Sequence, residues 1–171
     1  IEMIPRLVLL RGKPTSGKST AWHTLRKKKE LKDWIFVDNA SIKDMYDNLP
    51  NDERKDLGKK SLFEILKIVM KTRKNILLEE SSESTLMKYV GKWIKKYRYD
   101  IVTFQFEVSR KVAYKRDVQR AKDKWHPFMG KKLVDDLHNY HEEKFDKRGI
   151  LVDCDKLSKR GVVNFIMERL R

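Results

Sequence analysis

The sequence predicts one α/β domain built on a parallel β-sheet. Short apolar segments alternate along the chain with longer segments in which apolar residues recur at helical spacing. The short segments are apolar throughout, which is typical of strands that helices cover on both faces. No internal repeat, low-complexity tract or Pro/Gly/Ser-rich linker occurs among the 171 residues. We therefore expect a single domain that spans residues 1–171.

The N-terminal half is predicted to hold three strands and three helices. An apolar strand leads directly into Gly12, and Ala21, Trp22 and Leu25 share one side of the helix after it. A break between two helices is expected around Pro50. The predicted strands are 6–11, 34–37 and 75–78, and the predicted helices are 18–31, 41–49 and 58–73.

The C-terminal half continues the alternation with two strands and four helices. One of these helices directly follows the fourth strand and is strongly basic. Another helix follows the last strand and closes the chain. The predicted strands are 101–106 and 149–152, and the predicted helices are 84–97, 109–124, 131–145 and 158–170.

The composition indicates a basic globular protein of the cytoplasm. Hydrophobic residues at 40% exclude a disordered chain, and no apolar run reaches the roughly 20 residues that a membrane span needs. The single cysteine, Cys154, excludes an intrachain disulfide and a multi-cysteine zinc site. The 40 Lys and Arg residues exceed the 25 Asp and Glu residues by 15. Such a surplus predicts attraction to polyanions, although lysines also serve only to solubilise a surface.

The segment from Gly12 to Ser19 matches the phosphate-loop pattern G-x-x-x-x-G-K-[ST]. The glycines let the backbone wrap so that its N–H groups point at phosphate oxygens beside a helix N-terminus. Lys18 is expected to reach the outer phosphates, and the Ser19 hydroxyl is expected to ligate Mg²⁺. A chance match is disfavoured because the motif follows a strand and opens a helix. The predicted nucleotide-binding residues are Gly12, Lys13, Pro14, Thr15, Ser16, Gly17, Lys18, Ser19 and Thr20.

Among phosphate-loop proteins, the sequence favours a small kinase that uses ATP (or GTP) with Mg²⁺. A GTPase would carry an Asn-Lys-x-Asp base-reading motif, and none occurs. The segment Asp146–Gly149 has the form D-x-x-G, but it lies near the end of the chain, far from the third strand. A motor or unfoldase ATPase usually needs a longer chain. A kinase fits in this length.

Asp38 is the candidate general base. It ends the second predicted strand, and open parallel sheets bind ligands at the carboxyl ends of their strands. A carboxylate there can accept the proton of an attacking hydroxyl and orient it toward the γ-phosphate. The alternative is that Asp38 only caps the helix expected near Ser41. We favour the catalytic role because a kinase needs such a base.

Glu79 and Glu80 end the third predicted strand, where an acid commonly holds the Mg²⁺ shell through water. Because strand side chains alternate between faces, only one of the two can point toward the metal. We assign that place to Glu80, with Ser19 as the other metal ligand.

Arg116 and Arg120 are the candidate transition-state cations. They are four residues apart in the basic helix, so they lie on one helical face. Two guanidinium groups there can clamp phosphates and neutralise the charge that develops during transfer. The alternative is a solvated basic face with Asp117 and Asp123 as local partners.

Together, the phosphate loop, Asp38, the acid after the third strand and the pair Arg116 and Arg120 resemble the polynucleotide-kinase and zeta-toxin group of phosphate-loop kinases. This resemblance implies a three-layer P-loop NTPase fold with strand order 2-3-1-4-5 and a helical lid at roughly 109–132. It also implies that Asp38 is the base for a 5′-hydroxyl and that Arg120 contacts the ATP phosphates. One departure is Ser41, which stands where polynucleotide kinases often carry an arginine, so Lys43 is the candidate to hold the substrate phosphate.

The distribution of basic residues favours a nucleic-acid substrate. Residues 110–132 hold nine basic and two acidic residues, and 86–98 hold five basic residues and no acid. In the latter segment Tyr89, Trp93 and Tyr97 recur every four residues, which is typical of a base-stacking platform or, more often, of a core face. We predict a kinase that phosphorylates a hydroxyl at the end of an RNA or DNA strand. The alternatives are a kinase for a nucleoside, metabolite or nucleotide-sugar, and a nucleotide-switched nucleic-acid-binding domain without catalysis.

Overall fold

The computed structural model describes residues 2–79, 83–122, 128–144 and 149–171. Its contacts divide the chain into two compact units. The first unit comprises Ile1–Leu10 and Arg26–Thr103, and the second comprises Arg11–Leu25 and Phe104–Arg171. The expectation of one domain over 1–171 stays a prediction. Within the described ranges, no helix has both the length and the apolar character that crossing a membrane requires.

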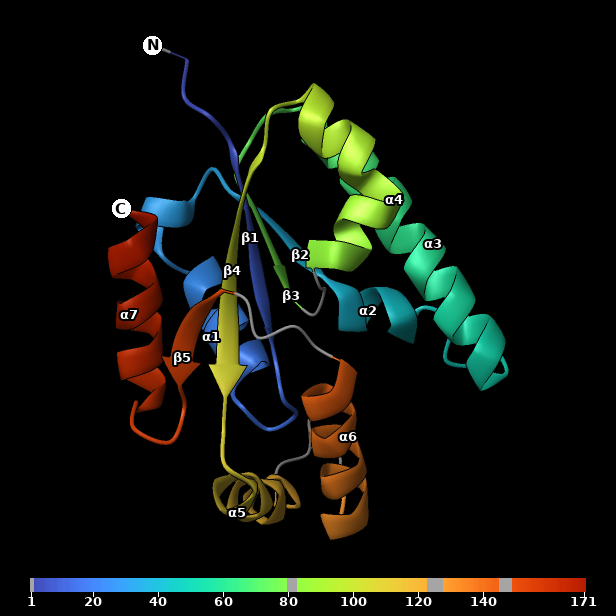
Figure 1. Ribbon diagram of the computed structural model, residues 1–171, viewed down its shortest axis with the longest axis vertical. Helices are drawn as coiled ribbons and strands as arrows, with labels where there is room; N and C mark the ends of the chain where they lie inside the picture. Colours follow the sequence, from blue (N-terminus) through green and yellow to red (C-terminus); the bar gives the residue numbers. More distant parts are fainter. Residues whose placement is uncertain (1, 80–82, 123–127, 145–148) are drawn as a thin grey trace. The chain divides into compact units, whose positions relative to one another are not determined.

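Five parallel strands form one sheet in the order β2-β3-β1-β4-β5 (Figure 1). The strands are β1 (Arg6–Gly12), β2 (Ile35–Asp38), β3 (Ile76–Glu79), β4 (Asp100–Glu107) and β5 (Ile150–Asp153). Each coincides within two residues with a segment that the apolar runs predict. The predicted three-layer α/β fold and its strand order are therefore confirmed.

Seven α-helices occur in the described part of the chain, and the first three differ most from their predicted bounds. The first helix stops at Arg26, and after the extended backbone of Lys28 a 3₁₀ turn (Lys29–Leu31) carries Leu31 into the interior. The second ends at Asp44, before the predicted end at residue 49. The helices are α1 (Lys18–Arg26), α2 (Asn39–Asp44), α3 (Asn51–Met70), α4 (Glu83–Lys96), α5 (Arg110–Arg120), α6 (Lys131–Lys144) and α7 (Lys159–Leu170).

Helix α3 begins directly after Pro50, seven residues before the predicted start at Gly58. Asp52 and Glu53 occupy its first turn, where negative charge is favourable beside the exposed backbone N–H groups. Gly58 is a close-packing position inside the helix. A Cβ added there would stand 2.8 Å from Cγ of Lys43, so the missing side chain lets α2 pack against α3.

The core of the first unit lies between the strands β1 to β3 and the helices α3 and α4. Residues at helical spacing on α3 (Leu62, Leu66 and Met70) meet those on α4 (Leu86, Val90 and Ile94) and the strand residues Leu7, Leu9, Ile76 and Leu78. Trp93 and Tyr97 pack against this cluster and are partly buried. Tyr89 is 37% exposed. The aromatic series therefore divides, because two of its rings serve the core and one lies at the surface.

The strand register aligns the candidate carboxylates of the first unit. Asp38 on β2 is opposite Glu79 on β3, and Glu79 is opposite Leu10 on β1. Leu10 precedes Gly12 by two residues, so β1, β2 and β3 end at one edge of the sheet just before the phosphate loop begins. In the second unit, Glu107 is opposite Asp153 at the same ends of β4 and β5.

Candidate active site

The phosphate loop joins β1 to α1 through backbone conformations that require its two glycines. Gly12 has φ +145°, and a Cβ there would overlap the carbonyl oxygen of Phe106 in β4. Gly17 has φ +96°, a value that side chains strongly disfavour. Thr15, between them, has φ +60°. A non-glycine residue held there is a strained element of the kind that clusters at ligand sites.

Three polar side chains of the loop are buried in a way that suits a bound phosphate. Thr15 and Ser16 are 4% and 2% exposed, and their hydroxyl oxygens have no hydrogen-bond partner among the described residues. The Lys18 ammonium, 6% exposed, donates to the carbonyl oxygens of Gly12 at 2.7 Å and Lys13 at 3.2 Å. Because buried hydroxyls normally find a partner, the loop fits an oxygen-rich anion such as a nucleotide phosphate.

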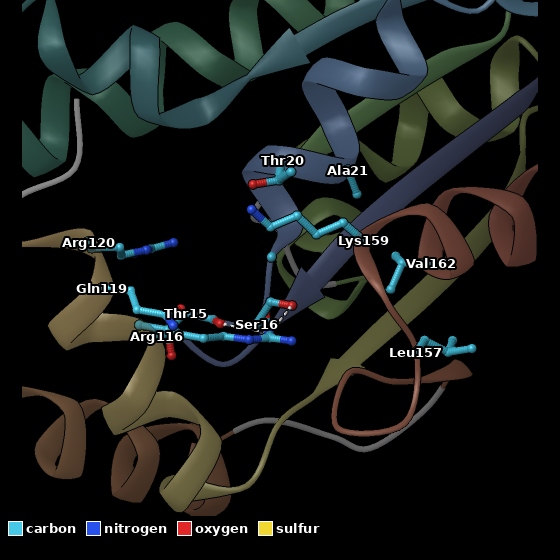
Figure 2. Close-up of a pocket in the computed structure, with 11 residues that line it drawn as sticks. Thr15, Ser16, Thr20, Ala21, Arg116, Gln119, Arg120, Leu157, Lys159 and Val162 are labelled. Atoms are coloured by element: carbon cyan, nitrogen blue, oxygen red, sulfur yellow. Dashed lines mark hydrogen bonds between the residues drawn. The ribbon is translucent and has the colours of Figure 1, made fainter. Parts of the chain in front are cut away.

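A cavity of about 240 Å³ adjoins the loop in the second unit. Figure 2 shows Gln119 and Arg120 on the α5 side and Lys159 and Val162 on the α7 side. The cavity lining thus combines positively charged side chains with apolar ones, as a site for a nucleotide requires. Its lining residues are Thr15, Ser16, Gly17, Thr20, Ala21, Arg116, Gln119, Arg120, Leu157, Lys159 and Val162.

The Arg116 side chain binds backbone carbonyl oxygens of the phosphate loop. Its Nη1 donates to the carbonyl oxygens of Thr15 and Ser16, each at 3.1 Å (Figure 2). Its Nη2 donates to the carbonyl oxygen of Cys154 at 2.8 Å. The guanidinium therefore ties the loop to the end of β5. Cys154 is 1% exposed, and this burial raises the pKa of its thiol to about 11.

Arg116→Ala is expected to destabilise the protein and disorder the loop. Removing charge-assisted hydrogen bonds to three partly buried carbonyls costs about 2 kcal/mol, which for this size lowers Tm by roughly 4–8 °C. Turnover should fall as well. Calorimetry measures the loss of stability, and nucleotide titration measures the effect on binding. Arg116→Lys is the matched variant, because it keeps the positive charge but removes the planar guanidinium that donates to all three carbonyls. An unchanged Tm in Arg116→Ala would contradict the clamp.

Helix α6 is tied to the loop by charges that the sequence did not reveal. Lys13 Nζ pairs with Glu107 at the end of β4 (3.2 Å) and with Glu142 on α6 (3.4 Å). Arg110 on α5 also pairs with Glu142, at 3.4 Å. His138 on α6 is fully buried, and burial lowers the pKa of its imidazole, with the Lys13 ammonium lowering it further. The Glu142 carboxylate, shared by Lys13 and Arg110, thus joins α6 to the loop and to α5.

Asp38 stands where the helix-cap alternative places it. Its Oδ1 accepts a hydrogen bond from the Ala40 N–H at 3.0 Å and its Oδ2 accepts one from the Ser41 hydroxyl at 2.6 Å. The carboxylate is therefore the N-cap of α2, and it stays partly accessible. Lys43 lies at the end of the same helix with its stem against Gly58. The catalytic role of Asp38 and the phosphate-binding role of Lys43 stay predictions.

The predicted metal ligands are only partly described. Ser19 lies in the first turn of α1, and Glu79 is 2% exposed at the end of β3. Glu80 lies outside the described residues, as do Asp123 and the stretch 123–127 of the predicted lid. Asp117, the other acid considered as a partner for the arginines, accepts the backbone N–H groups of residues 129 and 130, each at 2.9 Å. This carboxylate orders the start of α6.

Several residues of the site could not be identified from sequence motifs. Gln119, Leu157, Lys159 and Val162 line the cavity without belonging to any motif. The signal that points to part of this set is positional. The segment after the last strand follows a carboxyl end of the sheet, where ligands bind in parallel α/β folds.

Comparisons with solved structures identify the fold. No protein-family model and no curated protein matches the sequence. A proposed kinase from Chloroflexus aurantiacus matches with a TM-score of 0.69 and 16% identity, over 99% of this chain and 98% of that one. A gluconokinase from Sinorhizobium meliloti 1021 matches with a TM-score of 0.59 and 18% identity, over 99% and 95%.

A chain of the Pnkp1/Rnl/Hen1 RNA repair complex also matches, with a TM-score of 0.64 and 25% identity. The match covers 85% of the present chain and 48% of that one, so the present chain spans about half of its length. The structural neighbours are P-loop kinases, and the chain has their fold.

Proposed function

We propose that this protein is a phosphotransferase that moves the γ-phosphate of ATP (or GTP) to a hydroxyl at the end of a nucleic-acid strand. The observation that carries the transferase assignment is the loop itself. It buries two hydroxyls that have no hydrogen-bond partner among the described residues, beside the Lys18 ammonium and next to a cavity lined by Arg120. The P-loop kinase neighbours support the same chemistry.

The residues of this chain take distinct parts in the proposed reaction. Backbone N–H groups of the loop and Lys18 hold the β- and γ-phosphates, and Arg120 approaches the charge that develops on the transferring group. Ser19 and Glu80 would hold Mg²⁺, which supplies charge neutralisation on the phosphate oxygens. Asp38 takes the proton of the attacking hydroxyl, and Lys43 holds the substrate phosphate. Arg116 positions the loop through the carbonyls of Thr15 and Ser16.

The choice of a nucleic-acid end rests on charge and on one neighbour. The chain carries a net charge of +15, with nine basic and two acidic residues in 110–132. A small neutral acceptor gains little from such a surplus, whereas a strand gains affinity and orientation. The 25% identical neighbour belongs to an RNA repair complex.

A small-molecule acceptor is the second candidate. It is favoured by the gluconokinase match, which covers 95% of that enzyme.

Label transfer from γ-phosphate-labelled ATP separates the two candidates. Oligonucleotides of one sequence, as RNA and as DNA, would be offered with a 5′-hydroxyl or with a 5′-phosphate, beside gluconate and a panel of nucleosides. We expect labelling of 5′-hydroxyl strands and none of 5′-phosphorylated strands. Labelling of a small molecule alone would replace the acceptor and keep the transferase. No transfer to any acceptor, with nucleotide still bound, would favour the nucleotide-switched binding domain.

A further inference from the structure

Helices α3 and α4 lie side by side in the first unit (Figure 1). The lysines of α4 are exposed beside α3. We propose that this surface binds the sugar–phosphate backbone of a single-stranded nucleic acid. The proposal rests on the proposed function, whose acceptor is the end of such a strand, and it adds where the body of the strand is held. We call the surface the lysine face, formed by Lys59, Lys88, Tyr89, Lys92, Trp93, Lys95 and Lys96.

The charge of α4 is unbalanced where that of α3 is balanced. Helix α4 carries four lysines and one acid, Glu83. All four lysines are exposed, and none forms an ion pair with a carboxylate in the described part of the chain. On α3, by contrast, five basic residues face four acids, and Lys60 and Lys67 each pair with an acid on the same helix at 2.6 Å. A surface that only needs solubility mixes both signs, as α3 does.

The lysines of α4 form a line. Lys88, Lys92 and Lys96 follow one another at intervals of four residues, so they rise about 6 Å each along one side of the helix. A linear array of cations suits a linear array of phosphates. A small acceptor can contact only one or two of these lysines, so it does not account for the whole row.

An aromatic ring lies at the edge of this line. Tyr89 is 37% exposed and its ring stacks on Phe63 at 4.6 Å between centroids. Lys59 Nζ donates to the Tyr89 hydroxyl at 2.9 Å and lies 4.3 Å from the ring centroid, and Lys88 lies 5.3 Å from it. The Lys59 hydrogen bond lowers the pKa of the Tyr89 hydroxyl, with a further contribution from Lys88, as expected where positive charge is concentrated.

Aromatic rings beside cations are the combination that binds single strands without sequence preference. The second ring, Trp93, lies 4.5 Å from the Lys67 ammonium and is partly buried against the core. It is therefore held rigidly next to the row. The lysine face therefore suits a flexible single strand better than a duplex, because the phosphates of a single strand can follow the helix.

The test compares two variants that remove the same number of charges from the first unit. One carries Lys88→Gln, Lys92→Gln, Lys95→Gln and Lys96→Gln. The control carries Lys27→Gln, Lys28→Gln, Lys29→Gln and Lys32→Gln, which lie around the 3₁₀ turn. Tm reports folding of both. Fluorescence anisotropy of a 5′-hydroxyl 20-mer single strand is measured from 50 to 200 mM salt, so that binding is read without phosphoryl transfer.

We expect the α4 variant to bind the strand at least about tenfold more weakly. The slope of log affinity against log salt should fall by about 0.7 for each phosphate that the variant no longer neutralises. The control should keep wild-type slope and affinity. Wild-type binding by the folded α4 variant overturns the inference, even if strands are phosphorylated and the proposed function stands. An equal weakening in the control also overturns it, since net charge alone then governs binding. Binding to vesicles of anionic lipid but to no strand overturns it in favour of a membrane surface.

The two proposals fail separately. A wild-type protein that phosphorylates only a small molecule removes the nucleic-acid acceptor, and the anisotropy measurement then decides on the face by itself. If that protein binds no strand, the face is overturned too. If it binds strands and the α4 variant does not, the face is supported as a nucleic-acid surface on a kinase with another acceptor.

Discussion

Lys18→Ala is expected to reduce the turnover of phosphoryl transfer by about a thousandfold. The ammonium lies within the loop, 2.7 Å from the carbonyl oxygen of Gly12, so its charge is placed before the nucleotide arrives. Removing one preorganised donor from a site that stabilises developing negative charge typically costs 10²- to about 10³-fold in turnover, and the donor here is also a full charge. Single-turnover transfer of labelled phosphate at saturating ATP measures the effect.

Two controls separate this effect from misfolding. Lys18 is buried and makes two hydrogen bonds to the loop, so Lys18→Ala also costs about 1–2 kcal/mol of stability, which thermal unfolding reports. Lys13→Ala removes a charge from the same loop, but that ammonium pairs with the carboxylates of Glu107 and Glu142 instead of donating to the carbonyl oxygens of the loop. We expect it to change turnover much less. A folded Lys18→Ala protein with near-normal turnover would show that the loop does not act on phosphate.

Asp38→Asn is expected to lower turnover by about a hundredfold or more while nucleotide binding persists, because an amide cannot accept the proton of the attacking hydroxyl. The structure makes this substitution unusually informative. Asparagine keeps an oxygen that can accept the Ala40 N–H, so the cap of α2 survives with little change in stability. Turnover and Tm, measured on the same preparation, then report the base and the cap separately.

Asp38→Ala and Ser41→Ala complete this comparison. Asp38→Ala removes both functions and should cost about 1 kcal/mol of stability in addition to turnover. Ser41→Ala removes the hydroxyl that donates to Oδ2 at 2.6 Å and leaves the carboxylate in place, so turnover should stay within a few-fold of wild type. If Asp38→Asn keeps turnover and only Asp38→Ala lowers stability, Asp38 is a cap and not the base.

The sequence by itself predicted the five strands, their parallel arrangement and the phosphate loop. These features are local: an apolar run is buried wherever it lies, and glycines suit the positive φ values of +145° and +96° that the loop adopts. Helix bounds were less predictable where packing overrides local preference. The helix was predicted to start at Gly58, yet Gly58 lies inside α3, where its missing side chain leaves room for Lys43 of α2.

Only the tertiary structure decided what the charged side chains of the site do. Spacing put Arg116 and Arg120 on one helical face but did not show that Arg116 would bind the carbonyls of Thr15 and Ser16. Likewise, no pattern paired Lys13 with Glu142, which is 129 residues away. A long flexible cation finds its partner through the folded backbone, and carbonyl oxygens are invisible in a sequence because every residue carries one. The motif of the phosphate loop can thus be read from a short stretch of sequence, whereas the contacts that hold the loop in place arise from the tertiary structure.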